Sequence, residues 1–256
     1  MKNSNYFRCK QSENKRKRKP SFLDSCAFIL FNNEMKECML SKKEVLKRYI
    51  LFVISLFFAA FGVAITKRGE LGVSPISSVA NVMSSFSDSV SLGTWLVIWN
   101  CILILGQIVL LRKNFMPVQL LQIPLSFLFG IFTDFGMYCV SFITVPNYAV
   151  RIILVLVGTL TLGFGISLSV VANVIMNSGE AFVKAVSDRT GIKFGNVKIG
   201  FDICCVLASV ILSLILFSGT VVGTREGTVL TALLTGIVVN FFVKRIEKPL
   251  NSVLND

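Results

Sequence analysis

Two acidic side chains lie inside apolar stretches of the sequence, where a charge is costly. Asp134 and Asp202 are each flanked by runs of Leu, Ile, Val and Phe. An ionised aspartate at the centre of a lipid bilayer costs about 2.5–3.5 kcal/mol on insertion scales, so it is retained where it is paired, hydrated or neutral. Two interpretations stay open for each carboxylate: hydrogen bonding to a neighbouring helix, or a site for a cation, a proton or a substrate amine.

Amide side chains extend this polar pattern. Asn100 and Gln107 are seven residues apart, as are Asp202 and Ser209, and this spacing keeps two side chains on one face of a helix. Further candidates for an ion or substrate pathway lie towards the ends of apolar stretches: Asn173, Asn240, Arg225 and Glu226. For the neighbouring Arg225 and Glu226, the alternatives are mutual pairing, a gate, or a contact to an anion.

The residue inventory excludes several kinds of chemistry. The chain has no His, which removes imidazole acid–base chemistry and His metal ligands, and its seven Cys show no C-x-x-C spacing. There is no nucleotide-binding motif, nucleophile motif or pair of carboxylates on one helix. We therefore expect no metal, no cofactor and no enzymatic activity.

The elements that must position these residues are membrane helices. The chain is 54% hydrophobic, with a mean hydropathy of +0.72, which is too apolar for a soluble domain of this length. Six stretches are long enough to cross a hydrocarbon core of about 30 Å. They lie near residues 49–66, 92–111, 118–143, 149–174, 197–217 and 221–243.

Short sequence matches indicate that the chain is a duplication. The segment Gly130–Phe135 returns as Gly236–Phe241, and the segments beginning at Phe61 and Gly93 return at Phe164 and Gly195. The order and near-constant offset predict two repeats of three helices, at residues 48–146 and 147–246. Because each repeat has an odd number of spans, the two would lie inverted in the membrane, an arrangement that recurs in secondary transporters.

Lys and Arg are distributed as in a membrane protein with both termini in the cytoplasm. Residues 1–48 hold 13 Lys/Arg against 5 Asp/Glu, so residues 1–47 are predicted to be a basic, disordered cytoplasmic tail. With the N-terminus inside, cytoplasmic loops and the C-terminal tail (residues 247–256) would hold nine further Lys/Arg, and the outer loops four. The partner indicated is a lipid bilayer, not a nucleic acid; the oligomeric state stays open.

A longer connector follows the first helix of each repeat. Ser74 and Pro75 are typical of a helix start, and the second connector starts similarly at Asn177–Ser178. Glu180 and Lys184 stand four residues apart there and are expected to pair. Each connector is either a short helix lying on the membrane surface, which we favour, or a half-helix that dips into the membrane.

Four short motifs resemble those of the YczE/YyaS/YitT group of bacterial integral membrane proteins. They are Leu71–Pro75, Leu92–Thr94, Gly130 with Asp134, and Arg225–Thr228, and the resemblance spans about residues 45–245. It implies a bacterial inner-membrane protein whose biochemical activity is not established for the group. It supplies no binding or catalytic residues.

Two functions remain open. The predicted inverted repeats and inward polar stripes favour a secondary transporter of a small polar or charged solute, with its site between the repeats. The alternative is an accessory or stabilising protein that binds partners through faces of small residues, such as the column of Gly219, Gly223 and Gly227. The small-residue faces of the third and sixth spans, which carry Gly130 and Gly236, are expected to lie against each other or against neighbouring helices.

Overall fold

A computed structural model describes residues 42–87, 89–112, 115, 117–192 and 194–255. The chain divides into two units, residues 1–47 and 48–256, and the features below belong to the second. Most of the predicted basic tail lies outside the described residues. Its last residues, 42–47, are helical and begin the first long helix.

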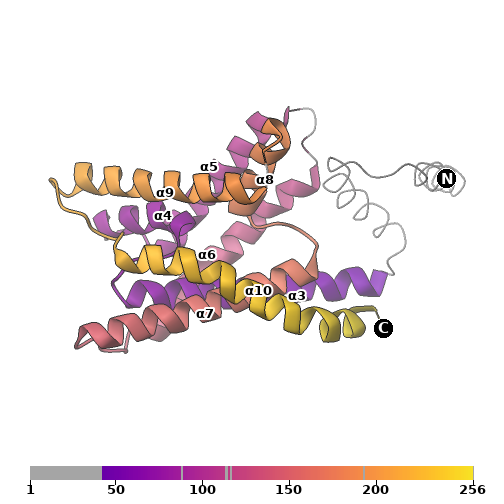
Figure 1. Ribbon diagram of the computed structural model, residues 1–256, viewed down its shortest axis with the longest axis horizontal. Coiled ribbons are helices and arrows are strands. Elements are labelled where there is room, and N and C mark those ends of the chain that lie inside the picture. Colours follow the sequence, from indigo (N-terminus) through magenta and orange to yellow (C-terminus); the bar gives the residue numbers. More distant parts are fainter. Residues whose placement is uncertain (1–41, 88, 113–114, 116, 193, 256) are drawn as a thin grey trace, which may run out of the picture. The chain divides into compact units, whose positions relative to one another are not determined.

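The described residues form helices and no strands. Along the chain (Figure 1) they are α3 (Lys42–Arg68), α4 (Pro75–Phe86), α5 (Leu92–Leu111), η3 (Pro117–Leu121), α6 (Gln122–Val140), α7 (Tyr148–Ala172), α8 (Ser178–Thr190), α9 (Phe194–Leu216) and α10 (Glu226–Asn255). Six of them, α3, α5, α6, α7, α9 and α10, contain stretches long and apolar enough to cross a membrane. The six predicted spans are therefore confirmed to within a few residues at most ends.

Local sequence signals account for several helix ends. The Ser91 hydroxyl accepts a hydrogen bond from the Thr94 N–H (3.1 Å) at the start of α5, and Pro75 occupies the start of α4 as predicted. At α10 the structure differs from the sequence prediction. This helix starts at Glu226, five residues later than expected, and continues through Pro249 to Asn255, where a tail was expected.

Four long helices, α3, α6, α7 and α10, pack together and are called the scaffold below. Glycines let α3 and α7 approach closely: a Cβ on Gly62 would overlap the Leu162 backbone, and one on Gly165 would overlap the Ala59 nitrogen. In the same way, Gly136 of α6 lies against Ala64 of α3. Small residues allow such approach where lipid provides no hydrophobic force between helices.

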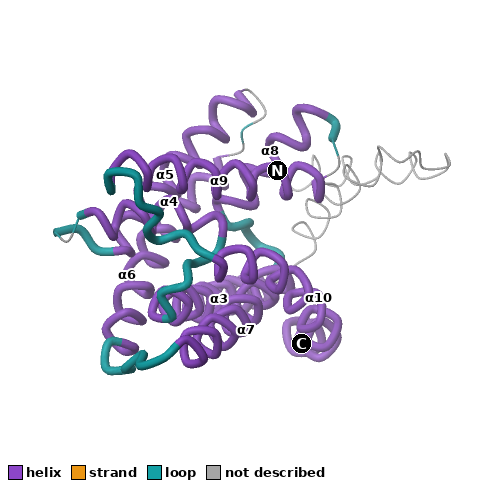
Figure 2. The backbone as a smooth tube through the Cα atoms, turned by 60° about the vertical axis from the view of Figure 1, so that its left-hand side comes forward, coloured by secondary structure: helices purple, strands orange, loops and turns teal. Residues whose placement is uncertain are grey.

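The other four helices, α4, α5, α8 and α9, form what is called the ring below. Both short helices lie against α5 and α9, and α4 also contacts α10. Figures 1 and 2 show α4, α5 and α9 together on one side, and α3 and α7 on the other. The ring and the scaffold meet chiefly where α5 packs along α6.

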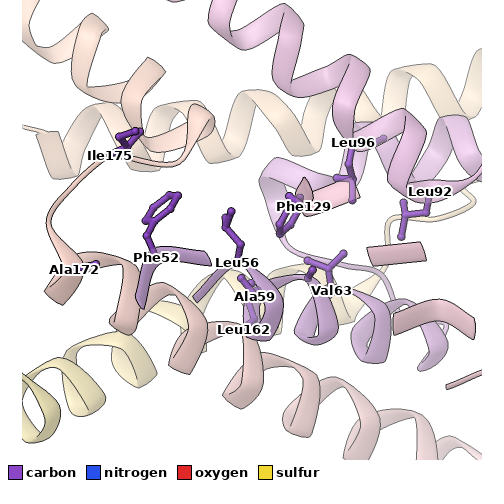
Figure 3. Packing of buried hydrophobic residues seen from close by; sticks show 12 residues of the cluster. Phe52, Leu56, Ala59, Val63, Leu92, Leu96, Phe129, Leu162, Ala172 and Ile175 are labelled. Carbon is purple, nitrogen blue, oxygen red and sulfur yellow. The ribbon is translucent and has the colours of Figure 1, made fainter. Parts of the chain in front are cut away.

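An apolar core joins the ring to the scaffold. Phe52, Leu56 and Val63 of α3 face Leu96 of α5 and Phe129 of α6 (Figure 3). The outward faces carry large exposed apolar side chains, including Leu105, Val109, Ile131, Leu233 and Ile237. Such a surface is suited to lipid.

Candidate functional site

Helices α4 and α8 are too short to cross a membrane, and their first turns lie beside the middles of longer helices. With 12 and 13 residues, they are about 18 and 20 Å long. The Ser78 hydroxyl of α4 donates to the Cys205 carbonyl, midway along α9 (3.4 Å). The Ser178 hydroxyl of α8 donates to Asn100 Oδ1 in the middle of α5 (2.6 Å). These contacts agree better with the half-helix alternative than with the surface helix that the sequence analysis favoured.

A buried hydrogen-bond network holds the first turn of α8. Gln107 Nε2 donates both to the Ser178 carbonyl (3.0 Å) and to Gln122 Oε1 on α6 (3.2 Å). Asn100, Gln107, Gln122 and Ser178 are all at most 6% exposed. The seven-residue stripe therefore predicted Asn100 and Gln107 as inward-facing, but Ser178 and Gln122 were not among the predicted site residues.

An ion pair lies beside this network. Lys198 Nζ is 2.5 Å from each carboxylate oxygen of Asp202, one turn further along α9. Both side chains are less than one-third exposed, and Glu180 in the first turn of α8 interacts electrostatically with both. Lys198 thus pairs with Asp202 on α9 and also interacts electrostatically with Glu180 of α8.

Sequence reasoning missed the roles of Glu180 and Lys198. It paired Glu180 with Lys184 along α8, whereas in the structure Glu180 interacts electrostatically with Lys198 and Asp202 of α9, and Lys184 interacts with Asp188. The four-residue spacing of Lys198 and Asp202 was the available signal for their pairing. The partner of Glu180 carried no local signal, because α8 and α9 meet only in the folded chain.

The surroundings of Glu180 favour its neutral form. Burial raises the pKa of the Glu180 carboxyl, Lys198 opposes the rise, and Asp202 adds to it. The positive end of the α8 dipole acts on the same turn and favours a negative charge there. The arrangement is chemically able to exchange a proton, a cation or an amine. We call Asn100, Gln107, Gln122, Ser178, Glu180, Lys198 and Asp202 together the α8 site.

Asp134 has a structural role at the start of α5. Its Oδ1 accepts the Gly93 N–H (2.8 Å) and its Oδ2 accepts the Ser91 hydroxyl (2.6 Å). Gly93 and Gly130 pack backbone to backbone at this point, where a Cβ on Gly93 would overlap the Gly130 carbonyl. The Asp134 carboxylate therefore caps α5 from α6, which matches the interhelical alternative considered for it.

The remaining four candidates lie at helix ends or on an exposed face. Asn173 ends α7 in the left-handed conformation (φ 49°). Arg225 and Glu226 start α10, half exposed and 3.9 Å apart, and Glu226 also accepts a hydrogen bond from the Tyr148 hydroxyl. Asn240 is exposed on α10. The α8 site, in contrast, is formed mainly by the first turn of α8 and inward positions of α5 and α9.

The four motifs behind the family resemblance form two helix contacts. One is the Gly93–Gly130–Asp134 contact described above. In the other, the Gly227 N–H donates to the Leu71 carbonyl (2.9 Å), and a Cβ on Gly72 would overlap the Thr228 hydroxyl. Gly72 also has a φ of 109°, which only glycine adopts readily. These motifs therefore maintain close packing and belong to the architecture.

The six apolar helices fit a multi-pass membrane protein. A model of a family of unknown function, DUF6198, matches residues 46–244, and the chain belongs to this family. No curated protein and no solved structure matches it significantly. The resemblance to the YczE/YyaS/YitT group stays a prediction.

Proposed function

We propose that this protein is a secondary transporter of a small polar or charged solute, and that solute and coupling ion are handled at the α8 site. The observation that carries the proposal is the first turn of α8, which lies beside the middle of α5 among buried polar side chains and partly buried charged ones. Secondary transporters build mid-membrane sites from interrupted or partial helices in this way.

Matching contacts in the two halves support the inverted repeat that such a mechanism needs. Each half has the same order of a long helix, a short helix and two long helices. Gln107 bonds to Gln122 near the α5–α6 connection, and Thr224 bonds to Ser209 near the α9–α10 connection, each pair being 15 residues apart. The short helix of each half also packs against the middle long helix of the other.

The shared lysine gives the site a means of coupling. With Glu180 and Asp202 both ionised, Lys198 balances only one of the two negative charges. A proton or a cation taken up from one side of the membrane would neutralise the second negative charge. Because the pKa of Glu180 is raised, this carboxyl keeps its proton up to a higher pH than an ordinary glutamate.

Transport in reconstituted vesicles tests the proposal. Amines, amino acids, vitamins and organic anions would be offered under an imposed pH or sodium gradient. We expect one class to accumulate with the gradient, Asp202→Asn and Glu180→Gln to abolish the gradient dependence, and Asp188→Asn, elsewhere on α8, to keep it. If Asp202→Asn lowers stability and leaves coupled uptake intact, the carboxylate is structural and the proposed site is wrong.

One observation favours the alternative of a membrane-embedded accessory protein. Ala232, Gly236 and Asn240 form an exposed face on α10, where a partner helix has room to pack. In either role we expect a protein of the bacterial cell membrane with both termini in the cytoplasm and no enzymatic activity.

A further inference from the structure

Repeat-related helix pairs are packed differently in the two halves. In the first half, α5 packs along α6, and the start of α5 is held by Asp134 through Gly93 and Ser91. The sequence offsets place Gly236 and Asn240 of α10 at the positions of Gly130 and Asp134. By the same offsets, the start of α9 corresponds to the start of α5, which Asp134 holds.

In the second half the equivalent contact is not made. Gly236 has no atom of another element within 4 Å of a Cβ built on it, whereas Gly130 has Val97 at 2.6 Å and the Gly93 carbonyl at 2.8 Å. Asn240 on α10 is exposed, and so is Asn196 in the first turn of α9. The α10 face thus has the composition of the α6 face but lacks its partner.

The opposite ends of both helix pairs are joined alike. Gln107 bonds to Gln122 between α5 and α6, and Ser209 bonds to Thr224 between α9 and α10 (2.8 Å). The α9–α10 connection also contains Gly219 and Gly223 at positive φ, which suits a bend. The two pairs are therefore both held near their connections and differ at their far ends.

We infer that the start of α9 closes onto the Gly236–Asn240 face of α10 in a second state, in which the start of α5 leaves Gly130 and Asp134. The four ring helices contact one another in a closed circuit, so they move as one body. A tilt that brings α9 to α10 at one end separates α5 from α6 at the other. This exchange rests on the proposed transport function, for which it supplies the alternating access to the α8 site.

The two contacts are unequal in strength, which accounts for the state observed. Asp134 is a carboxylate and makes charge-assisted hydrogen bonds, while Asn240 offers only a neutral amide. The state with α5 closed on α6 is accordingly lower in free energy. Weakening the Asp134 contact should shift the population towards closure of α9 on α10.

Disulfide trapping in vesicles tests this exchange. In a chain without its seven native cysteines, Asn196→Cys and Asn240→Cys would be introduced together, with a protease site at Gly219. We expect oxidation to join the two fragments of one chain after cleavage. Ser91→Ala, which removes one hydrogen bond to Asp134, should increase the rate of disulfide formation several-fold, and Asp134→Asn should increase it as well. Ile131→Ala, which changes an exposed residue of α6, should leave this rate unchanged.

Three outcomes would overturn the inference. The first is that no variant forms a disulfide. The second is that neither Ser91→Ala nor Asp134→Asn changes the rate of disulfide formation. The third is that every disulfide joins two different chains and also forms in the single variant Asn240→Cys. The last would assign the α10 face to a second copy of the chain. Closure in the absence of any solute uptake would keep the exchange and reject the transport function, so the two failures are distinguishable.

Discussion

Lys198 interacts with two carboxylates, so the three charged residues of the α8 site are not equivalent. Asp202→Asn leaves Glu180 to balance Lys198, whereas Lys198→Met leaves two interacting carboxylates without a lysine in a partly buried place. We expect Lys198→Met to destabilise the protein by about 1 kcal/mol more than Asp202→Asn. Thermal unfolding in detergent measures the difference.

The double variant Lys198→Met/Asp202→Asn supplies the control. It removes one carboxylate together with the lysine, so its stability should recover part of the loss seen with Lys198→Met alone. A larger loss for Asp202→Asn than for Lys198→Met would show that Glu180 does not share the lysine.

At the scale of helices, glycines at equivalent repeat positions have different surroundings. Gly130→Leu places a side chain against Val97 and the Gly93 backbone and should prevent normal packing of α5 on α6. The side chain added by Gly236→Leu meets open space. The free energy of unfolding of this variant should therefore stay within about 0.5 kcal/mol of that of the native protein. Folded yield and melting of the two variants provide the comparison.

This expectation revises the one drawn from the repeat alone, which had both glycine faces packed. Equal damage by the two substitutions would mean that the Gly236 face is occupied in the membrane. In that case the Gly236 face is covered either by the start of α9, in the second state, or by a partner helix.

At the scale of the whole molecule, the Lys/Arg distribution and the inverted repeat predict one orientation. Cysteine labelling or reporter fusions at Arg68, Arg151 and Gly219 should locate these positions outside the cell, and Lys113 and Lys193 inside. The half-helices α4 and α8 would then enter the membrane from opposite sides. One reversed loop would contradict the inverted arrangement.

The sequence by itself determined the parts of this protein that depend on local properties. Apolar length located the six spans, and the Ser74–Pro75 and Asn177–Ser178 signals located the starts of α4 and α8. These features follow from how many apolar residues a bilayer requires and from how the first turn of a helix satisfies its backbone. Neither depends on what the helix later packs against.

Which polar groups meet depends on the packing of the helices and could not be predicted from the sequence. Periodicity showed that Asp134, Asn100 and Asp202 are on polar faces, but not that the first caps α5 while the others lie beside α8. The same pattern of small residues is packed around Gly130 and exposed around Gly236. Contacts between helices distant in sequence depend on how whole helices are placed, and equal faces meet different neighbours when the two halves are packed differently.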